Sequence, residues 1–389
     1  MENKKTVNID LKQYSMIFAL IAIYLIFYFI TGGVNATPMN MNNLIMQNGY
    51  IVILAAGMLL CVLTGNVDLG VGSYLALCGS IAAKLVVEQG WSVPAAFAVT
   101  IVIGIVFGAW NGFFIAYLNI PPFVVTLAGQ LIGRGLTYTL LQSKTVGPLP
   151  QNYVDVGAGF IFTKKVPFGN GMIDLVTIVV AVIVIAGLIF NEIRTINAQK
   201  KYGFATVKKS QVIAKLAVIS AIIVFFFYKL ALYNGIPNVL VIMAVVVAIY
   251  HFITSKTVAG RQVYALGGNA KAARLSGIDT KKVFFWVYTN MGFLSAIAGI
   301  VLSARNASAT PKAGSGLELD AIASCYIGGA AAAGGVGTIM GAVVGAFVMG
   351  VLNNGMFLMG LSTDIQQVVK GLVLLGAVTF DIISNSKKA

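Results

Sequence analysis

Charged side chains are rare in the apolar stretches of this sequence, so the few that occur there are the first candidates for chemistry. Asp68, Arg134 and Lys370 each lie within or at the edge of a long apolar run. A charge in a hydrocarbon environment is costly, so such residues usually face protein or water. Two interpretations remain open: the residues line a pathway or gate for a polar solute, or they form structural ion pairs between helices.

Amide side chains are the second group of polar residues in these runs. They can form hydrogen bonds with a neutral hydroxylated solute, and they can equally hold helices together. The amides in or near the apolar runs are Asn111, Gln130, Asn290, Asn353 and Asn354. Together with the charged side chains they define a candidate translocation path or gate. Its residues are Asp68, Asn111, Gln130, Arg134, Asn353, Asn354 and Lys370.

Catalytic chemistry has no candidate residues here. His251 is the sole histidine, and the loops contain no Ser/His/Asp set and no paired carboxylates. Cys61, Cys78 and Cys325 all lie in apolar segments without the spacing of a metal site or a disulfide framework. We therefore predict no catalytic residue, no metal site and no cofactor bound by this chain.

Glycine motifs are frequent, but none predicts nucleotide binding. No Gly-Lys dipeptide occurs, so the chain lacks a Walker A loop for ATP hydrolysis. Gly334–Gly341 nearly matches a dinucleotide fingerprint, but Met340 occupies the third glycine position. Glycines repeated at every fourth position instead predict faces for close helix packing and hint at an internal repeat. They are Gly104, Gly108 and Gly112 in the first half, and Gly337, Gly341 and Gly345 in the second.

The composition identifies the elements that position these residues. The 389 residues are 58% hydrophobic and only 10% charged, with a mean hydropathy of +0.90. Because soluble domains are about a quarter charged, we expect an all-α polytopic membrane protein. Apolar periodicity predicts about twelve helical segments. They are 14–30, 44–64, 73–87, 93–118, 123–141, 172–190, 212–232, 238–254, 283–304, 319–333, 338–358 and 365–383.

The net charge of +14 is explained by topology, and we expect no nucleic-acid binding. Residues 1–13, 191–211, 255–282 and 385–389 hold 16 of the 26 Lys and Arg. Such an excess in short loops is typical of the cytoplasmic side. Both termini are therefore predicted to be cytoplasmic, and Arg305 and Lys312 to lie in an external loop.

Several interruptions of the helices are predicted. Four glycines around Asp68 indicate a helix break near membrane depth, which is tolerated only where protein or water surrounds it. Asn119–Pro122 ends another helix. The segment 319–333 is short enough to be re-entrant or broken, and 143–171 is interpreted as an external loop.

A polar stretch, Gly260–Ile278, separates two apolar runs. Asn269 is a good helix N-cap, Ala270 to Ser276 are mostly helix formers, and Gly277 suits a left-handed helix end. This pattern predicts a helix of about two turns with Lys271 and Arg274 on one side. Because so short a helix is unstable alone in water, it should dock against something.

The chain resembles the permease subunit of bacterial monosaccharide ABC importers, the ribose, galactose and xylose class. The matching residues are Asp68–Ser73, Asn111-Gly112, Ile120–Ala128, Gly260-Arg261, Tyr264–Asn269, Ala272–Ile278, Glu318–Ala323, Ile327–Gly329, Gly334–Gly337 and Lys370-Gly371. Gly70 and Ile365 depart from the usual serine and tryptophan of the family. The resemblance implies one permease domain, 1–389, with halves 14–171 and 233–389. The added helical pair 172–232 is similar to that of the xylose and multiple-monosaccharide permeases.

The resemblance also implies roles and partners. Loop 255–282 would contact a cytoplasmic ATPase subunit, which holds ATP-Mg, through the coupling helix 269–278. The implied coupling residues are Arg261, Gly267, Gly268, Asn269, Ala272, Ala273, Arg274 and Gly277. An extracytoplasmic sugar-binding protein, a second permease copy and the lipid of the bacterial inner membrane complete the expected surroundings. The alternatives are an ion-coupled secondary transporter and a membrane enzyme or scaffold, and the sequence does not identify the sugar.

Overall fold

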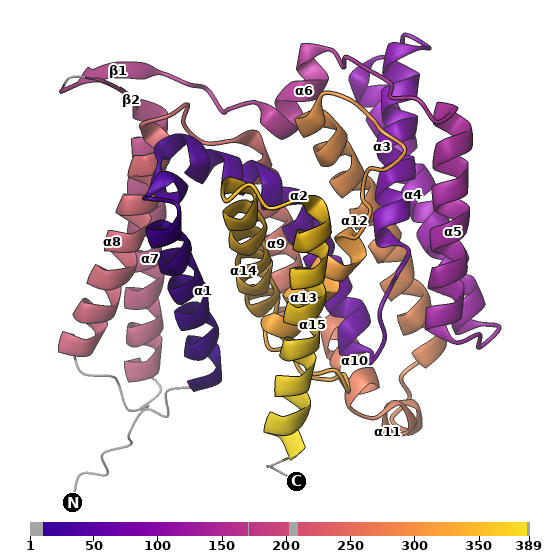
Figure 1. Cartoon of the computed structure of the whole chain (residues 1–389). Coiled ribbons are helices and arrows are strands. Elements are labelled where there is room, and N and C mark those ends of the chain that lie inside the picture. The colour runs from indigo at the N-terminus through magenta and orange to yellow at the C-terminus, as the bar shows by residue number, and fades with distance from the viewer. Residues whose placement is uncertain (1–10, 170, 202–208, 387–389) are drawn as a thin grey trace, which may run out of the picture. The chain divides into compact units, whose positions relative to one another are not determined.

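Helices form nearly all of the regular structure in the computed structural model, which describes residues 11–169, 171–201 and 209–386 (Figure 1). The first half contains α1 Leu11–Ile30, α2 Pro38–Leu63, α3 Val71–Val87, α4 Val93–Ala116, α5 Pro122–Leu141 and α6 Gln151–Ala158. The middle contains α7 Leu175–Lys201 and α8 Lys209–Ala231. The second half contains α9 Asn238–Lys256, α10 Val258–Gly268, α11 Ala270–Leu275, α12 Thr280–Asn306, α13 Leu317–Ile327, α14 Ile339–Leu358 and α15 Thr363–Ser386.

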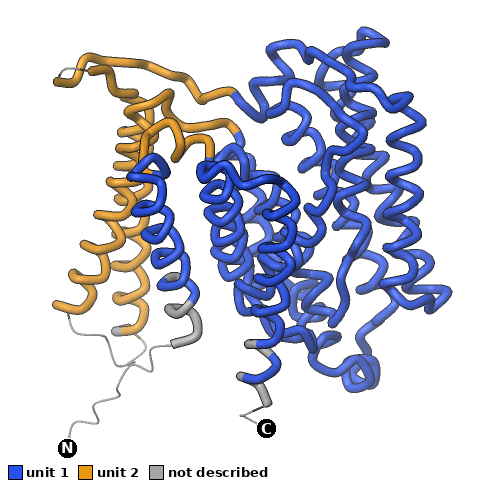
Figure 2. The backbone as a smooth tube through the Cα atoms, viewed as in Figure 1, with its two compact units in different colours: residues 1–35, 44–158, 239–389 blue, residues 36–43, 159–238 orange. Residues whose placement is uncertain are grey.

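The chain divides into two compact units (Figure 2). Unit 1 comprises residues 1–35, 44–158 and 239–389, and unit 2 comprises residues 36–43 and 159–238. Both halves that the sequence predicts as the permease core contribute to unit 1. The predicted added helical pair, now α7 and α8, belongs to unit 2.

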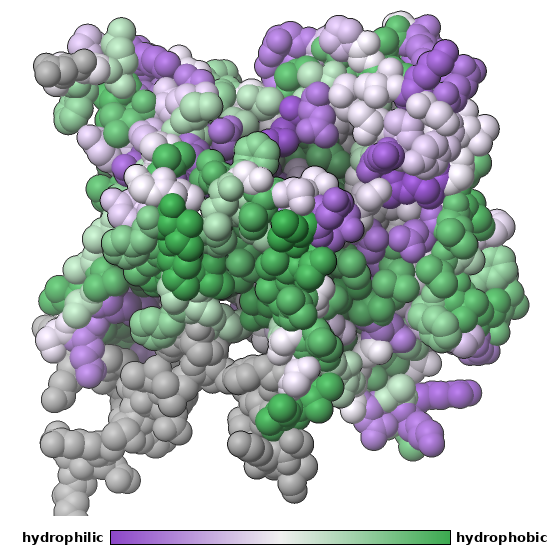
Figure 3. All heavy atoms as spheres, viewed as in Figure 1, coloured by the Kyte–Doolittle hydropathy of each residue, from purple (hydrophilic) through white to green (hydrophobic). Residues whose placement is uncertain are grey.

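Seven helices in the described part of the chain are long and apolar enough to cross a membrane. The described residues are therefore those of a polytopic helical protein, and twelve segments with cytoplasmic termini stay a prediction. In unit 1 the exposed faces of α5 and α15 are apolar, as Leu131 and Leu372 illustrate. Hydrophobic side chains also cover α14 and α15 in the space-filling view (Figure 3).

The core of unit 1 is built around α12, which packs along α3 and α4. The three repeated glycines of α4 make this approach possible. A Cβ at Gly104, Gly108 or Gly112 would meet the backbone of α12 at Gly292, Tyr288 or Phe285. This glycine face therefore serves helix packing within the chain, as small-residue faces do in membrane proteins.

Two interrupted helices meet inside unit 1. The chain leaves α2 at Leu63 and re-enters a helix at Val71, where the sequence predicts a break. A second irregular segment, 307–316, precedes α13. A Cβ at Gly72 would meet the carbonyl oxygen of Gly314, and a Cβ at Gly314 that of Gly72. The start of α3, directly after the first break, is therefore in backbone contact with the second irregular segment.

The segment predicted at 319–333 is wrong in its bounds. The structure has α13 at Leu317–Ile327, followed by irregular backbone at 328–338. Eleven residues of helix span about 16 Å, roughly half of a hydrocarbon core. The prediction was too long because a run of small residues after Ile327 continues the apolar pattern of the sequence beyond the end of the helix.

Three further expectations need correction. Gly337 lies in the irregular segment with a φ of +153°, so only Gly341 and Gly345 of that predicted face are on α14, where they contact α13. Arg305 belongs to the last turn of α12, and only Lys312 lies in the loop that follows. The polar stretch contains a second helix, α10, which the sequence did not predict as a separate element.

Unit 2 contains the two β-strands of the described residues, which form a hairpin that begins in the region interpreted as an external loop. Strands β1 Lys165–Phe168 and β2 Gly171–Asp174 pair antiparallel. Helix α7 therefore begins at Leu175, and Met172, predicted as helical, is in a strand. Asp174 ends the hairpin and caps α7, because its Oδ2 accepts a hydrogen bond from the Thr177 backbone N–H at 2.9 Å.

Candidate functional site

Helix α11 begins and ends with specific local bonds. The Asn269 side-chain oxygen accepts a hydrogen bond from the backbone N–H of Ala272 at 3.0 Å. At the other end Gly277 has a φ of +85°, a conformation that glycine adopts without steric cost. The Ile278 N–H then bonds to the carbonyl of Ala273 at 3.1 Å. Both ends of this six-residue helix are thus closed by the chain itself.

The two sides of α11 differ in what they contact. Ala273 is buried against the rest of the chain, whereas Lys271 and Arg274 are exposed. Leu275 is 90% exposed, which is unusual for a large apolar side chain on a polar helix. Hydrophilic side chains gather over α10 and α11 (Figure 3). The outer side of α11 therefore offers one apolar contact flanked by two cations.

Helix α10 ties this outer helix to the interior of unit 1. The Thr257 hydroxyl caps it by accepting a bond from the Gly260 N–H at 3.2 Å. Its Leu266 is 2% exposed, and the Tyr264 hydroxyl donates to the carbonyl of Gly337 at 2.7 Å. A Cβ at Gly267 would meet the carbonyl oxygen of Leu63, the last residue of α2.

The irregular segment 328–338 is held at the same place. The Gly335 N–H donates to the same Leu63 carbonyl at 2.9 Å. A Cβ at Gly335 would meet the backbone of Gly268 at 2.9 Å. The C-terminal end of α2, the C-terminal end of α10 and the segment before α14 therefore meet at one point, next to α11.

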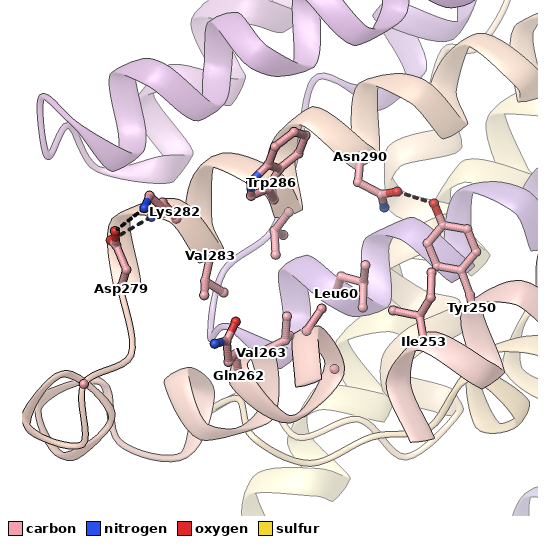
Figure 4. Close-up of a pocket in the computed structure, with 14 residues that line it drawn as sticks. Leu60, Tyr250, Ile253, Gln262, Val263, Asp279, Lys282, Val283, Trp286 and Asn290 are labelled. Carbon is pink, nitrogen blue, oxygen red and sulfur yellow. Dashed lines mark hydrogen bonds and ion pairs between the residues drawn. The ribbon is translucent and has the colours of Figure 1, made fainter. Parts of the chain in front are cut away.

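A cavity of about 570 Å³ lies beside α10, between α9 and the first turns of α12. Its walls are mainly apolar, with Val263, Val283 and Trp286 among them (Figure 4). At one end the Tyr250 hydroxyl donates to the Asn290 side-chain oxygen, and at the other Lys282 and Asp279 form an ion pair at 3.5 Å (Figure 4). The backbone N–H of Lys282 holds the pKa of the Asp279 carboxyl below its usual range.

Asp68 and Asn111, predicted for the path, make structural contacts near the first helix break. Asp68 is buried, and its Oδ1 accepts a bond from the Gly70 N–H at 2.9 Å, immediately before α3. The Asn111 amide donates to the Tyr74 hydroxyl at 2.6 Å, which joins α4 to α3. These bonds favour the helix-holding interpretation for both residues.

Gln130 and Arg134 lie one turn apart on α5 and hold the second break. The Gln130 amide donates to the Glu318 carboxylate at 3.2 Å. Arg134 donates through Nη1 to the carbonyls of Pro311 and Ala313, at 2.9 and 2.6 Å. Arg134 thus satisfies two backbone carbonyls of the irregular segment 307–316.

Asn353 and Lys370 come together around Asp320, a residue that sequence reasoning did not single out. The Lys370 Nζ lies 2.8 Å from the Asp320 Oδ2, and the Asn353 amide donates to the same oxygen at 3.4 Å. Asn354, the next residue of α14, is buried. The seven predicted path residues are therefore distributed over separate sites at α3, at α5 and at α13.

Glu318 and Asp320 are the functional candidates that the sequence analysis missed. A signal was present, because two carboxylates stand at the start of a short apolar segment directly after Gly316. Their partners Gln130 and Lys370 are 188 and 50 residues away in the sequence, so these contacts could not be predicted from the sequence. Among the described residues no group of three or more His, Cys, Asp or Glu side chains is arranged to hold a metal ion.

Comparison with known proteins assigns this chain to a family. Residues 40–378 match the family model described as a branched-chain amino acid transport system permease component. The xylose transport system permease protein of Escherichia coli K12 is 36% identical over 374 residues, 96% of this chain and 92% of that protein. Its counterpart in Haemophilus influenzae Rd is 37% identical over 386 residues, 99% of each chain.

The ribose import permease protein of Escherichia coli K12 is 33% identical over 344 residues, 88% of this chain and 85% of that protein. No solved structure matches the chain. The matched relatives are transport permeases and not enzymes, which agrees with the absence of catalytic candidates in the sequence.

Proposed function

The chain belongs to the family of transport system permease components, and from this premise we propose that it is the membrane subunit of an ATP-driven sugar importer. It is a multi-pass protein of the bacterial cell membrane. The relatives' names make monosaccharides of the xylose and ribose type the first candidates for its substrate. The ATPase subunit that would hold ATP-Mg, the extracytoplasmic sugar-binding protein and a second permease copy belong to the same proposal.

The structure of α11 is the observation that supports coupling to an ATPase. A six-residue helix is stable only when it is packed, and α11 has both ends closed while its Leu275, Lys271 and Arg274 face outward. An exposed leucine flanked by cations fits a groove of a partner protein that has an apolar floor and acidic rims. We assign this surface, residues 269–278, as the contact with the cytoplasmic ATPase.

The contacts of α10 supply a route from that surface into the membrane helices. A displacement of α11 moves α10, because Asn269 is the end of one helix and the cap of the next. Helix α10 is joined to the end of α2 at Leu63 and to the segment before α14 at Gly337. A movement imposed by the ATPase therefore reaches two helices, α2 and α14, at the same time.

Alternating access follows if ATP binds two states of the transporter with different affinity. Shifting a two-state equilibrium from 1:99 to 99:1 needs about 5.5 kcal/mol of differential binding. The ATPase subunits would provide this free energy, and α11 would transmit it. The glycine-faced contact of α4 with α12 places the two backbones close together, so that pair is a rigid element of the movement.

The test of the coupling surface uses substitutions on its exposed side. In proteoliposomes with the partner ATPase and binding protein, Arg274→Glu and Leu275→Ala should lower sugar uptake and sugar-stimulated ATP hydrolysis about tenfold, the loss expected for a residue central to an interface. Arg194→Glu, on the exposed surface of α7 in unit 2, is the charge-matched control. Full uptake and full ATPase stimulation in both α11 variants would refute the assignment.

A further inference from the structure

The apolar cavity beside α10 lies between α9 and α12, two helices that are long and apolar enough to cross a membrane. Its volume of about 570 Å³ is in the range of cavities that hold a small molecule. Ile253 of α9, Val263 of α10 and Val283 of α12 are among its apolar walls. A cavity of this size and lining, between two such helices, suits an apolar chain.

The wall of this cavity continues onto an exposed apolar face of α9. Ile249 and Phe252 are exposed, and they lie one turn before and directly before Ile253, which lines the cavity. On α12, Trp286 lines the cavity and is also 64% exposed. Exposed apolar surface of this kind marks contact with a membrane or a partner, and tryptophan is enriched where membrane meets water. The cavity therefore has an apolar approach along a spanning helix.

Polar groups lie at both ends of the cavity. At the inner end the Tyr250 hydroxyl donates to the Asn290 side-chain oxygen, so these two groups satisfy one another. At the other end is Lys282, on the same face of α12 as Trp286 and Asn290 because the three are spaced four residues apart (Figure 4). Lys282 pairs with Asp279 at 3.5 Å, but both side chains are exposed. Such a surface pair contributes little, so Lys282 can still bind an anion.

A second basic side chain lies at the same end. Lys256 follows Ile253 by three positions and so lies on the same side of α9. Along their helices, Lys256 and Lys282 are about 9 Å and about 12 Å from the inner hydrogen bond, both toward α10 and α11. Residues 255–282 contain six Lys and Arg and a single acidic residue. This end of the cavity is therefore basic, and the same excess predicts that it faces the cytoplasm.

We propose that this cavity binds an anionic phospholipid of the cytoplasmic leaflet. An acyl chain of the lipid lies among the apolar walls, and its phosphate lies at Lys282 and Lys256. Basic pockets between membrane helices on the cytoplasmic side are suited to anionic headgroups. The proposal requires only that the chain spans the membrane, and it holds whatever solute the chain transports.

The partner ATPase is the other occupant to consider, because Gly277 and Asp279 also line the cavity. The exposed face at Ile249 and Phe252 favours a lipid, because this face belongs to a spanning helix, which a water-soluble subunit does not cover. A lipid satisfies the apolar wall and the basic end at once, since it carries both an apolar chain and a negative charge.

Quenching of Trp286 by brominated lipids tests the site in the full chain. The variant with Trp91→Phe and Trp110→Phe leaves Trp286 as the sole tryptophan. It is reconstituted in vesicles that mix phosphatidylglycerol and phosphatidylcholine, with one or the other brominated. Phosphatidylglycerol should be preferred about fivefold at Trp286, the factor that one basic side chain provides near an anionic lipid. Adding Lys256→Gln and Lys282→Gln should abolish the preference.

Two matched controls separate this site from general contact with lipid. In the first, Trp91→Phe and Trp286→Phe leave Trp110, which is 54% exposed on α4, a helix without charged residues. Quenching of Trp110 should show no preference between the two lipids. In the second, Lys312→Gln in the loop before α13 removes a charge away from the cavity and should leave the preference at Trp286 unchanged.

Several outcomes would overturn the proposal. They are equal quenching of Trp286 by both lipids, the same preference at Trp110, or a preference at Trp286 that survives both lysine substitutions. Loss of the quenching once the ATPase subunit is bound would assign the cavity to that partner instead. Native mass spectrometry of the chain with all its tryptophans gives a second measurement. It should show more retained phosphatidylglycerol than phosphatidylcholine, and equal retention would also contradict the proposal.

Discussion

Single side chains determine where the short helix of the polar stretch begins and how a buried carboxylate in α13 is compensated. Asn269 closes the N-terminus of α11, and Lys370 compensates the buried charge of Asp320. The first is a local interaction between residues three positions apart, and the second joins residues fifty positions apart. For this reason the first could be predicted from the sequence and the second could not.

Replacing the cap should weaken α11 specifically. Asn269→Ala removes the bond to the Ala272 N–H and should cost about 0.5–2 kcal/mol of helix stability. Asn269→Ser retains a capping oxygen and is the control. We expect the alanine variant to lose several-fold in sugar-stimulated ATP hydrolysis with the partner ATPase, and the serine variant to stay near the parent. Equal activity of the two variants would show that order in α11 does not matter for coupling.

Removing one partner of the Asp320–Lys370 ion pair should destabilise the protein more than removing both. Lys370→Met leaves Asp320 buried without a cation, and loss of one partner of a buried pair costs about 3–5 kcal/mol. The double variant with Asp320→Asn and Lys370→Met removes both charges and should recover most of the stability. Thermal unfolding in detergent measures both, and a double variant less stable than Lys370→Met alone would contradict this account.

The residues that could be predicted are those whose signal is local. The N-cap at Asn269 and the left-handed Gly277 follow from residue type and position, and the structure has both. Asp320 was missed because its importance depends on Lys370 and Asn353, which approach it only through the packing of α13, α14 and α15. A single sequence contains no record of such distant pairs.

At the scale of elements, the first turn of α3 and the irregular segment 307–316 are in contact inside unit 1. Gly72 and Gly314 lie against one another, and Arg134 holds the carbonyls of the second break. Irregular backbone inside a protein is stable only where neighbouring groups satisfy its polar atoms. The breaks themselves were partly predictable from glycines around Asp68, whereas their contact was not.

Adding one methyl group at this contact should be costly. Gly72→Ala would place a Cβ against the Gly314 carbonyl and the Glu318 carboxylate, and overpacking of this kind costs about 1–3 kcal/mol. Gly371→Ala on α15 meets no atom within 4 Å and is the matched control, which should be neutral or slightly stabilising. Apparent melting temperatures in detergent compare the two, and the contact would be unimportant if both variants melted alike.

Other elements escaped prediction for identifiable reasons. Glycines at 260, 267 and 268 disguise helix α10, although Gly267 is required by its close approach to Leu63. The β1-β2 hairpin of unit 2 is built from two four-residue strands, too short for an alternating pattern to stand out. Long apolar helices such as α4 and α12 were predicted to within a few residues, because a span leaves a continuous signal.

At the scale of the whole molecule, the account rests on one surface of a membrane subunit. It is the exposed side of α11, where an ATPase would act. The distribution of Lys and Arg predicted which side faces the cytoplasm, but the partners with which this surface would work are other chains. For that reason the class of transporter is best tested with those chains present.

The most direct measurement is uptake of radiolabelled D-xylose and D-ribose into proteoliposomes. The membranes contain this chain either alone or with its ATPase subunit, with the cognate binding protein outside and ATP inside. The account predicts uptake of one of these sugars that requires all three proteins and ATP, and that is unaffected when proton and sodium gradients are collapsed. Uptake by this chain alone, driven by an imposed proton or sodium gradient, would contradict it and identify an ion-coupled transporter.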